Sequence, residues 1–435
     1  MTGCVRRSDQ SRRAEASAFD GSGASMVMDR SNQNPLTVLN HWARVVWPFY
    51  LMAIMAGWSI LVWRSARLQQ GHVSSDWLLD YRFGFMRRGL PGELVWFLSD
   101  VTGGGAVYIV AAFQIGAFGL LLYALWRLTR AATVPLAGWL LAYSPATLLF
   151  SLFGLNEPGR KEVLLFALFA LASVLLSERH RKIAAMGVFA WCAAILIGLT
   201  AAMVVLSHEM TIFYMPWLMW LCWLAFSSLP IVRRLLLMFV LLAIPLMAFG
   251  SLMMWGGALE RQLFCRSFMD AGLSASICQG VLTFPIDDLA GSYRNTLLVI
   301  DQFDYVKTYG LGLVLLLVPV FWTAKIERFN WSGRALAGVL LCVLWSAPLF
   351  FVAVDWGRFI QIHVLLGLML WLAAQRFLPQ VSGVTPSSIP TRLSWSSVAL
   401  VVLGWISLGL WNLPVCCEAW VGTGIVGHVW ALLPR

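Results

Sequence analysis

Long apolar runs separated by short polar segments make up most of the chain after residue 40. A transmembrane helix needs about 20 mostly apolar residues to cross the hydrocarbon core of a bilayer. Runs of this kind fall at 45–63, 106–126, 134–153, 162–177, 183–206, 211–229, 235–256, 309–324, 336–354, 359–375 and 395–413. We therefore predict an all-α, polytopic transmembrane helical bundle of about eleven spans. The shorter run Leu94–Leu98 is expected to form an interfacial helix.

The composition agrees with this pattern. Hydrophobic residues make up 60% of the 435 positions and charged residues only 12%. A soluble protein of this size needs a far more charged surface, so lipid is expected to cover much of the outside. The formal net charge of +10 comes from short basic clusters between apolar runs, so we expect no nucleic-acid partner.

Four segments of the chain differ in character. Residues 1–40 are rich in Ser, Arg, Asn and Gly and are predicted to be a disordered cytoplasmic tail. Residues 41–377 are predicted to form the transmembrane core, 378–394 a flexible cytoplasmic linker, and 395–435 the last span with a periplasmic tail. No cleavable signal peptide is visible, and the first apolar run is expected to act as a signal anchor in a bacterial inner membrane.

The basic residues between the runs predict the orientation, because short cytoplasmic loops carry an excess of Lys and Arg. With the N-terminus inside, the inside loops are 127–130, 178–182, 233–234, 325–334 and 376–394. The outside segments are then 64–105, 154–161, 207–210, 257–308, 355–358 and 414–435.

Basic residues also occur in the outside segments, where the orientation rule disfavours them. Those in or beside the charged turns are Arg82, Arg87, Arg88, Arg160, Lys161 and Arg358. Guanidinium groups bind phosphate oxygens through two parallel hydrogen bonds, and the N-terminus of a helix also attracts anions. A phosphate-bearing ligand is the simplest explanation. The alternative is that these side chains are ordinary interfacial anchors.

Two carboxylates in the first outside segment are candidates for acid–base chemistry. Asp76 and Asp80 are four residues apart, so a helix would place both on one face. Partial burial would raise the pKa of such a carboxylate toward the working range of a general base. Alternatively, both carboxylates pair with nearby arginines and only order the segment.

The turn at His208-Glu209 joins two apolar spans, so both side chains are expected at or just below the membrane surface, where ionisable groups are costly. A zinc-protease motif is excluded, because His208-Glu209-Met-Thr-Ile212 lacks the second histidine. The remaining roles are a hydrogen bond to a sugar hydroxyl and a structural link to an outside arginine.

Asp355-Trp356-Gly357-Arg358 is a second tight turn at the same face. The Trp ring could stack on a sugar while the Arg binds phosphate, or the motif could be an aromatic belt with an internal Asp–Arg pair. The candidates for contact with sugar or acceptor are Tyr81, Glu157, Asp355 and Trp356.

The cysteines fall into two groups. Cys192, Cys222 and Cys342 lie within apolar runs and are expected to be packing residues. Cys265 and Cys278 share the largest outside segment and could form a disulfide in an oxidising periplasm, whereas the adjacent residues 416 and 417 are not expected to bond to each other. No cysteine spacing indicates a metal site. No cofactor is required, although a divalent cation would be compatible.

An acidic outside loop after the first span, further charged turns on the same face and about eleven helices together resemble the GT-C superfamily of membrane glycosyltransferases. The chain is also similar to the polytopic polymerases of bacterial surface polysaccharides. These resemblances are architectural and cover most of the chain beyond residue 40. They imply a polyprenyl-linked glycan lipid as donor, Asp80 or Asp76 at the catalytic centre, and outside arginines on the lipid phosphate.

The resulting hypothesis is glycosyl transfer from a polyprenyl phosphate or pyrophosphate at the periplasmic face, with partners in an envelope polysaccharide assembly. A transporter or flippase for an anionic lipid or solute is the rival from another class. It would need charges in the middle of spans, and the apolar runs are almost free of them. A noncatalytic envelope scaffold is the third possibility.

Overall fold

The computed structural model describes residues 35–153, 159–185, 187–257, 260–279, 282, 289–327, 333–377, 395–418 and 420–425. Within these residues the chain is helical, and its β-structure consists of two isolated bridges, Met86–Gly257 and Asn412–Gly422. The helices are α1 (Pro35–Arg67), α2 (Gly71–Leu78), α3 (Leu90–Thr102), α4 (Ala106–Ala131), α5 (Leu136–Ala142), α6 (Phe150–Phe153), α7 (Glu162–Ala185), α8 (Gly187–Ser207), α9 (Met215–Ala225), α10 (Ile231–Trp255), α11 (Arg261–Asp270), α12 (Leu289–Gln302), α13 (Tyr305–Ile326), α14 (Gly333–Ser346), α15 (Leu349–Val352), α16 (Trp356–Phe377) and α17 (Trp395–Ser407), with 3-10 helices η2 (Glu209–Tyr214) and η3 (Ala275–Cys278).

In the part of the chain that the structure describes, seven segments are long and apolar enough to cross a membrane. They are α1, α4, α8, α10, α13, α16 and the stretch Ala335–Val352, which spans α14 and α15. This finding supports a transmembrane helical bundle.

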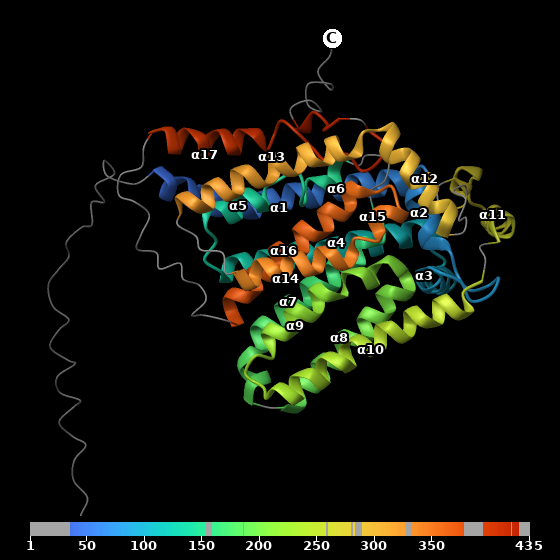
Figure 1. Cartoon of the computed structure of the whole chain (residues 1–435). Coiled ribbons are helices and arrows are strands. Elements are labelled where there is room, and N and C mark those ends of the chain that lie inside the picture. The colour runs from blue at the N-terminus through green and yellow to red at the C-terminus, as the bar shows by residue number, and fades with distance from the viewer. Residues whose placement is uncertain are drawn as a thin grey trace, which may run out of the picture.

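The long helices run in roughly the same direction, and the short helices α2, α3, α11 and α12 gather at one end of them (Figure 1). We call this the α2 end of the bundle. Helix α16 is the most enclosed of the seven candidate spans, with 72% of its apolar window buried, whereas Ala335–Val352 is only 17% buried. Helix α16 begins at the α2 end and continues through the enclosed part of the bundle. Arg358 is in its first turn and so lies at the α2 end.

Local sequence explains where several elements begin and end. Helix α3 has Pro91 in its first turn, where the missing N–H costs nothing, and it ends at Gly103 in the left-handed conformation (φ 66°). Helices α1 and α4 are held together by aromatic packing, with the rings of Trp58 and Phe118 stacked 4.4 Å apart.

Three of the predicted single spans are interrupted. The run 134–153 forms α5 and the four-residue α6, separated by a turn that contains Pro145. The run 336–354 breaks at Pro348 between α14 and α15, and the run 211–229 starts as the 3-10 helix η2. Proline removes a backbone donor and clashes with the preceding turn, which explains the first two breaks.

Other boundaries also move. Helix α1 begins at Pro35, so the prediction that the disordered tail extends to residue 40 was wrong for its last six residues, and residues 1–34 lie outside the described part. Helix α7 extends through its polar flank to Ala185, as expected for the short run 162–177, and Leu94–Leu98 lies within α3. The predicted linker 378–394 also lies outside the described residues.

Candidate functional site

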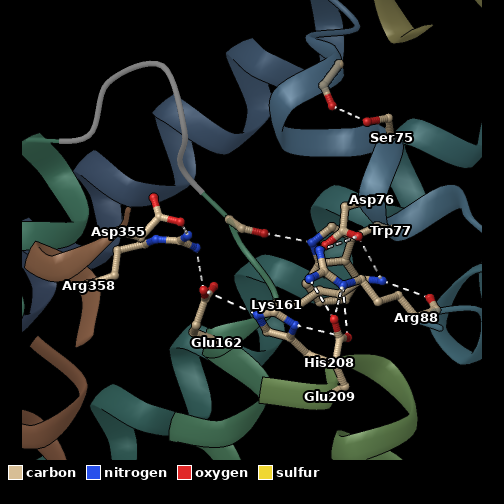
Figure 2. Close-up of polar contacts among 12 residues, drawn as sticks. Ser75, Asp76, Trp77, Arg88, Lys161, Glu162, His208, Glu209, Asp355 and Arg358 are labelled. Atoms are coloured by element: carbon tan, nitrogen blue, oxygen red, sulfur yellow. Dashed lines mark hydrogen bonds and ion pairs between the residues drawn. The ribbon is translucent and has the colours of Figure 1, made fainter. Parts of the chain in front are cut away.

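Nine ionisable side chains from five parts of the chain meet at the α2 end of the bundle, and all of them except Arg160 are labelled in Figure 2. They come from α2, from the turn before α3, from the segment that leads into α7, from the turn after α8, and from the start of α16. We call them the charge cluster: Asp76, Arg88, Arg160, Lys161, Glu162, His208, Glu209, Asp355 and Arg358.

One half of the charge cluster centres on Arg88. Its Nε and Nη2 atoms donate hydrogen bonds to both carboxylate oxygens of Glu209, at 2.9–3.2 Å. Its Nη1 atom lies 3.6 Å from Oδ1 of Asp76, and Nζ of Lys161 lies 3.5 Å from the same oxygen. The fully buried Lys161 also donates to the backbone carbonyl of Arg88 at 2.9 Å, which fixes the turn before α3 against α7.

The other half centres on Glu162, the first residue of α7. Arg358 donates to Glu162 from Nη1 and is paired with Asp355 through Nη2. Arg160 reaches Asp355, with 3.7 Å between Nη1 and Oδ1. His208 joins the two halves, because its Nε2 atom lies 3.4 Å from Glu162 and its Nδ1 atom 3.8 Å from Glu209.

The cluster is internally balanced in charge. Four Lys and Arg side chains face four carboxylates, so the sum is zero while His208 is neutral and +1 when it is protonated. The predicted outside excess of basic residues is therefore largely compensated by acidic residues that other segments bring to the same place. A phosphate would have to take the place of one of these carboxylates.

Burial and neighbouring charges act in opposite directions on the cluster's pKa values. Burial raises the pKa of Asp76, but the positive charges of Lys161 and Arg88 outweigh it, so the pKa is lowered. The prediction of a raised pKa was therefore wrong for Asp76, which is a carboxylate at neutral pH. Burial lowers the pKa of Lys161 to about 8, against the opposing effect of Asp76. Burial disfavours the charged form of His208, but hydrogen bonds with Glu162 and Glu209 raise its pKa.

Asp80 lies in a different set of contacts. Its carboxylate accepts hydrogen bonds from Arg82, from Nε at 2.6 Å and from the backbone N–H at 3.1 Å. Arg82 then donates to Ser267 of α11 and lies over the ring of Trp96, 4.8 Å from its centroid. Burial raises the pKa of Asp80, although Arg82 opposes this. Asp80 and Arg82 thus connect the segment between α2 and α3 to Ser267 of α11 and Trp96 of α3. Among the described residues, neither forms an ion pair with the charge cluster.

Arg87 and Tyr81, which the sequence also suggested as ligand-binding residues, are not part of the charge cluster. Arg87 is exposed and forms no ion pair within the described residues, and Glu157 lies outside them. The backbone N–H of Tyr81 donates to Glu93 at 2.6 Å, and its ring stacks on Phe85.

Trp356 is half-buried and is packed against neighbouring aromatic side chains. Its Nε1 atom donates to the carbonyl of Phe350 at 2.8 Å, and its ring packs against Tyr305 and Tyr309. The Asp–Arg pair in this motif matches the structural alternative for the turn at 355–358.

Two residues that hold the site were missed in the sequence. Trp77 and Gln114 both donate to the carbonyl oxygen of Gly159, each at 2.7 Å, just before Arg160 and Lys161. Gly159 has φ +83°, and a Cβ there would lie 2.5 Å from the amide carbon of Gln114. Gln114 could have been identified from the sequence, because it is an isolated amide within the apolar run 106–126. Polar side chains at membrane depth usually have a structural or functional role.

A pocket of about 50 Å³ adjoins the Glu162 half of the cluster. Its polar wall contains Arg160, Glu162, Arg358 and Gln361, and its aromatic wall contains Trp58, Phe118, Phe150 and Phe166. This volume is enough for a few water molecules and too small for a saccharide. A larger ligand would require side chains to move.

The disulfide between Cys265 and Cys278 is present and joins α11 to η3. Cys416 and Cys417 are also bonded to each other, so the expectation that they would not pair was wrong. Cys222 and Cys342 are buried packing residues as expected, whereas Cys192 is exposed on α8.

No group of three His, Cys, Asp or Glu side chains within the described ranges is arranged to hold a metal ion. In comparisons with known proteins, the sequence matches no family profile, no curated protein and no solved structure.

Proposed function

We propose that the chain is a membrane glycosyltransferase or polysaccharide polymerase. It would transfer a glycosyl unit, or a growing glycan, from a polyprenyl phosphate or pyrophosphate to an acceptor hydroxyl at the periplasmic face of a bacterial inner membrane. In this proposal the chain crosses the membrane about eleven times with its N-terminus in the cytoplasm, so the α2 end faces the periplasm.

The observation that carries the proposal is the position of Asp76. Its Oδ1 atom is buried and has no hydrogen-bond partner among the described residues, although Arg88 and Lys161 lie 3.6 and 3.5 Å away. A buried acceptor without a donor is uncommon, and a hydroxyl group of an acceptor would satisfy it. Asp76 is therefore the favoured carboxylate of the two candidates.

The low pKa of Asp76 makes it a weak base, so its role in the proposal is mainly to orient the acceptor hydroxyl. The acceptor oxygen would form a bond to the anomeric carbon while the bond from that carbon to the phosphate oxygen breaks. The hydroxyl proton would then pass to the departing phosphate, directly or through Asp76. Positioning and charge neutralisation would supply most of the acceleration, because phosphate is already a good leaving group.

Phosphate binding would use the pairs at the Glu162 half of the cluster. Arg160 and Arg358 both contact Asp355, and the pocket beside them combines these charges with aromatic walls. A phosphate offers guanidinium groups the same bidentate geometry as a carboxylate, so it could displace Asp355 without leaving either arginine uncompensated. The aromatic wall would favour the lipid part of the same substrate.

The balance of charge in the cluster also favours a second candidate function, a noncatalytic scaffold in an envelope complex. A network of paired ions can simply fix how five segments of the bundle meet. The transporter alternative has less support, because the ion pairs of this network lie at one end of the described helices and do not form a path between the two ends.

The test is an in vitro transfer assay with the full-length protein in nanodiscs. Lipid-linked saccharides extracted from the membranes of the native host would serve as donor and acceptor, and mass spectrometry would measure released polyprenyl phosphate or pyrophosphate. We expect Asp76→Asn to reduce release by about 100-fold or more. Asp80→Asn should have a smaller effect, because Asp80 lies outside the charge cluster.

Asp100→Asn is the matched control, since Asp100 is an exposed carboxylate in α3 at the same end of the bundle. Thermal unfolding of each variant separates loss of activity from loss of folding. Full release by a folded Asp76→Asn protein would exclude the mechanism. No release by the wild type under any donor condition would favour the scaffold.

A further inference from the structure

A second group of arginines lies at the end of the bundle opposite the charge cluster. Helix α7 begins at Glu162 in the cluster, and Glu178 follows sixteen residues later, about 24 Å along the helix axis. Here the last turns of α4 and α16 meet α7 around a cavity of about 780 Å³. The charged residues of its lining are Arg127, Arg130, Glu178 and Arg376.

The charges of this cavity, unlike those of the cluster, are not balanced. Three arginines line it, against the single carboxylate of Glu178. Arg127 forms an ion pair with that carboxylate, because its Nη2 atom donates a hydrogen bond to Glu178. Its Nη1 atom donates to the hydroxyl of Tyr123 at 3.0 Å. Arg130 and Arg376 are exposed and form no ion pair with the described residues.

The walls of the cavity are suited to a lipid. Trp126, Leu128 and Val174 supply apolar surface beside the arginines. The guanidinium group of Arg130 lies over the ring of Trp126, 5.4 Å from its centroid, and such a contact restrains the direction of the side chain. Tryptophan is common at the level of lipid headgroups, and basic pockets between transmembrane helices bind anionic headgroups.

We propose that this cavity binds the phosphate headgroup of an anionic membrane phospholipid, with Arg130 and Arg376 as the phosphate donors and the Trp126 wall against the acyl chain. The site is separate from the charge cluster and does not depend on the proposed transfer activity. The headgroup would supply the negative charge that Arg130 and Arg376 lack within the described residues.

Native mass spectrometry of the full-length protein tests this directly. The protein would be titrated with phosphatidylglycerol, with phosphatidylcholine, and with inorganic phosphate alone. We expect phosphatidylglycerol to bind preferentially, and the Arg130→Gln/Arg376→Gln variant to bind it about thirty-fold more weakly. Glu178→Gln should bind it more tightly, because the competing carboxylate is removed from Arg127.

Arg294→Gln is the control, because Arg294 is an exposed arginine of α12 at the α2 end. Its affinity for phosphatidylglycerol should equal that of the wild type. The proposal is overturned if the Arg130→Gln/Arg376→Gln variant keeps wild-type affinity, or if both lipids bind equally. Competition by inorganic phosphate as strong as that by the lipid would also overturn it, since the ligand would then be a soluble anion.

Discussion

Arg88 and Glu209 are 121 residues apart in the chain and form a bidentate ion pair at the α2 end of the bundle. Arg88 has φ +68°, a backbone conformation that costs a non-glycine residue about 1 kcal/mol or more. The pair with Glu209, together with the hydrogen bond from Lys161 to its carbonyl, holds the residue in this conformation. The turn before α3 is thus held in a strained form by contacts with α7 and η2.

Removing either partner of this pair should destabilise the protein. Both side chains are mostly buried, with 25% and 16% of their surface exposed, so we expect Arg88→Met and Glu209→Gln each to cost about 2 kcal/mol. The double variant should lose less than the sum of the two single variants, because neither charge is then left alone. Unfolding in detergent, analysed as a double-mutant cycle, gives the coupling energy.

Arg87→Met is the control for this cycle, since Arg87 is the exposed neighbour in the same turn. A change within about 0.5 kcal/mol is expected for it. Strict additivity of the Arg88 and Glu209 effects would show that the pair contributes nothing beyond packing.

Lys161 should make stability rise with pH in the alkaline range. Its pKa is about 8 in the folded protein and 10.5 in the unfolded chain. Between these values the unfolded chain binds more protons, so the free energy of unfolding increases with pH, by about 3 kcal/mol in total. The Lys161→Met variant lacks this rise, and the difference between the two unfolding curves against pH isolates it.

Lys307→Met provides the comparison, because Lys307 is an exposed lysine near the same end of the bundle. It should follow the wild-type curve. Parallel curves for the wild type and Lys161→Met between pH 8 and pH 10.5 would show that burial does not lower the pKa of Lys161.

The helical bundle and the end at which the polar residues gather follow directly from the sequence. Apolar runs of membrane length predict the long helices, and their alternation brings the segments 159–162, 207–209 and 355–358 to one end of the bundle. The first outside segment also supplies Asp76 and Arg88 to that end. These inferences need only periodicity and length.

The partners in each ion pair could not be predicted from a single sequence. The four-residue spacing of Asp76 and Asp80 predicted a shared helical face, but α2 ends at Leu78, so the two carboxylates point to different partners. The pairing of cluster residues that are far apart in the chain, such as Arg358 with Glu162, depends on helix packing. No local pattern encodes that packing.

Gly159 is the position where a single methyl group should disturb the site most. Gly159→Ala would strain a backbone with φ +83° and push against Gln114, so Trp77 and Gln114 would lose their shared acceptor. We expect a loss of about 2 kcal/mol in the free energy of unfolding. Gly116→Ala in α4, where a Cβ meets no other atom within 4 Å, should be neutral or slightly stabilising. Equal effects at both positions would exclude a special role for the Gly159 turn.

The Cys265–Cys278 disulfide offers a test of the proposed orientation. Disulfides persist in oxidising compartments such as the bacterial periplasm, and this one lies at the α2 end, in α11 and η3. If that end faces the periplasm, the bond should form in intact cells. Both cysteines should then be accessible to reagents that cannot cross the inner membrane.

We therefore expect a membrane-impermeant maleimide to label Cys265 and Cys278 on spheroplasts only after treatment with an impermeant reductant, in a variant whose other cysteines are serine. In the same background with Cys265 and Cys278 also replaced, Arg179→Cys should label only after the membrane is permeabilised, because Arg179 is an exposed residue of α7 at the opposite end. The reverse pattern would place the charge cluster in the cytoplasm. A donor presented at the periplasmic face could then not reach Asp76, and the proposed reaction would have to be abandoned together with the orientation.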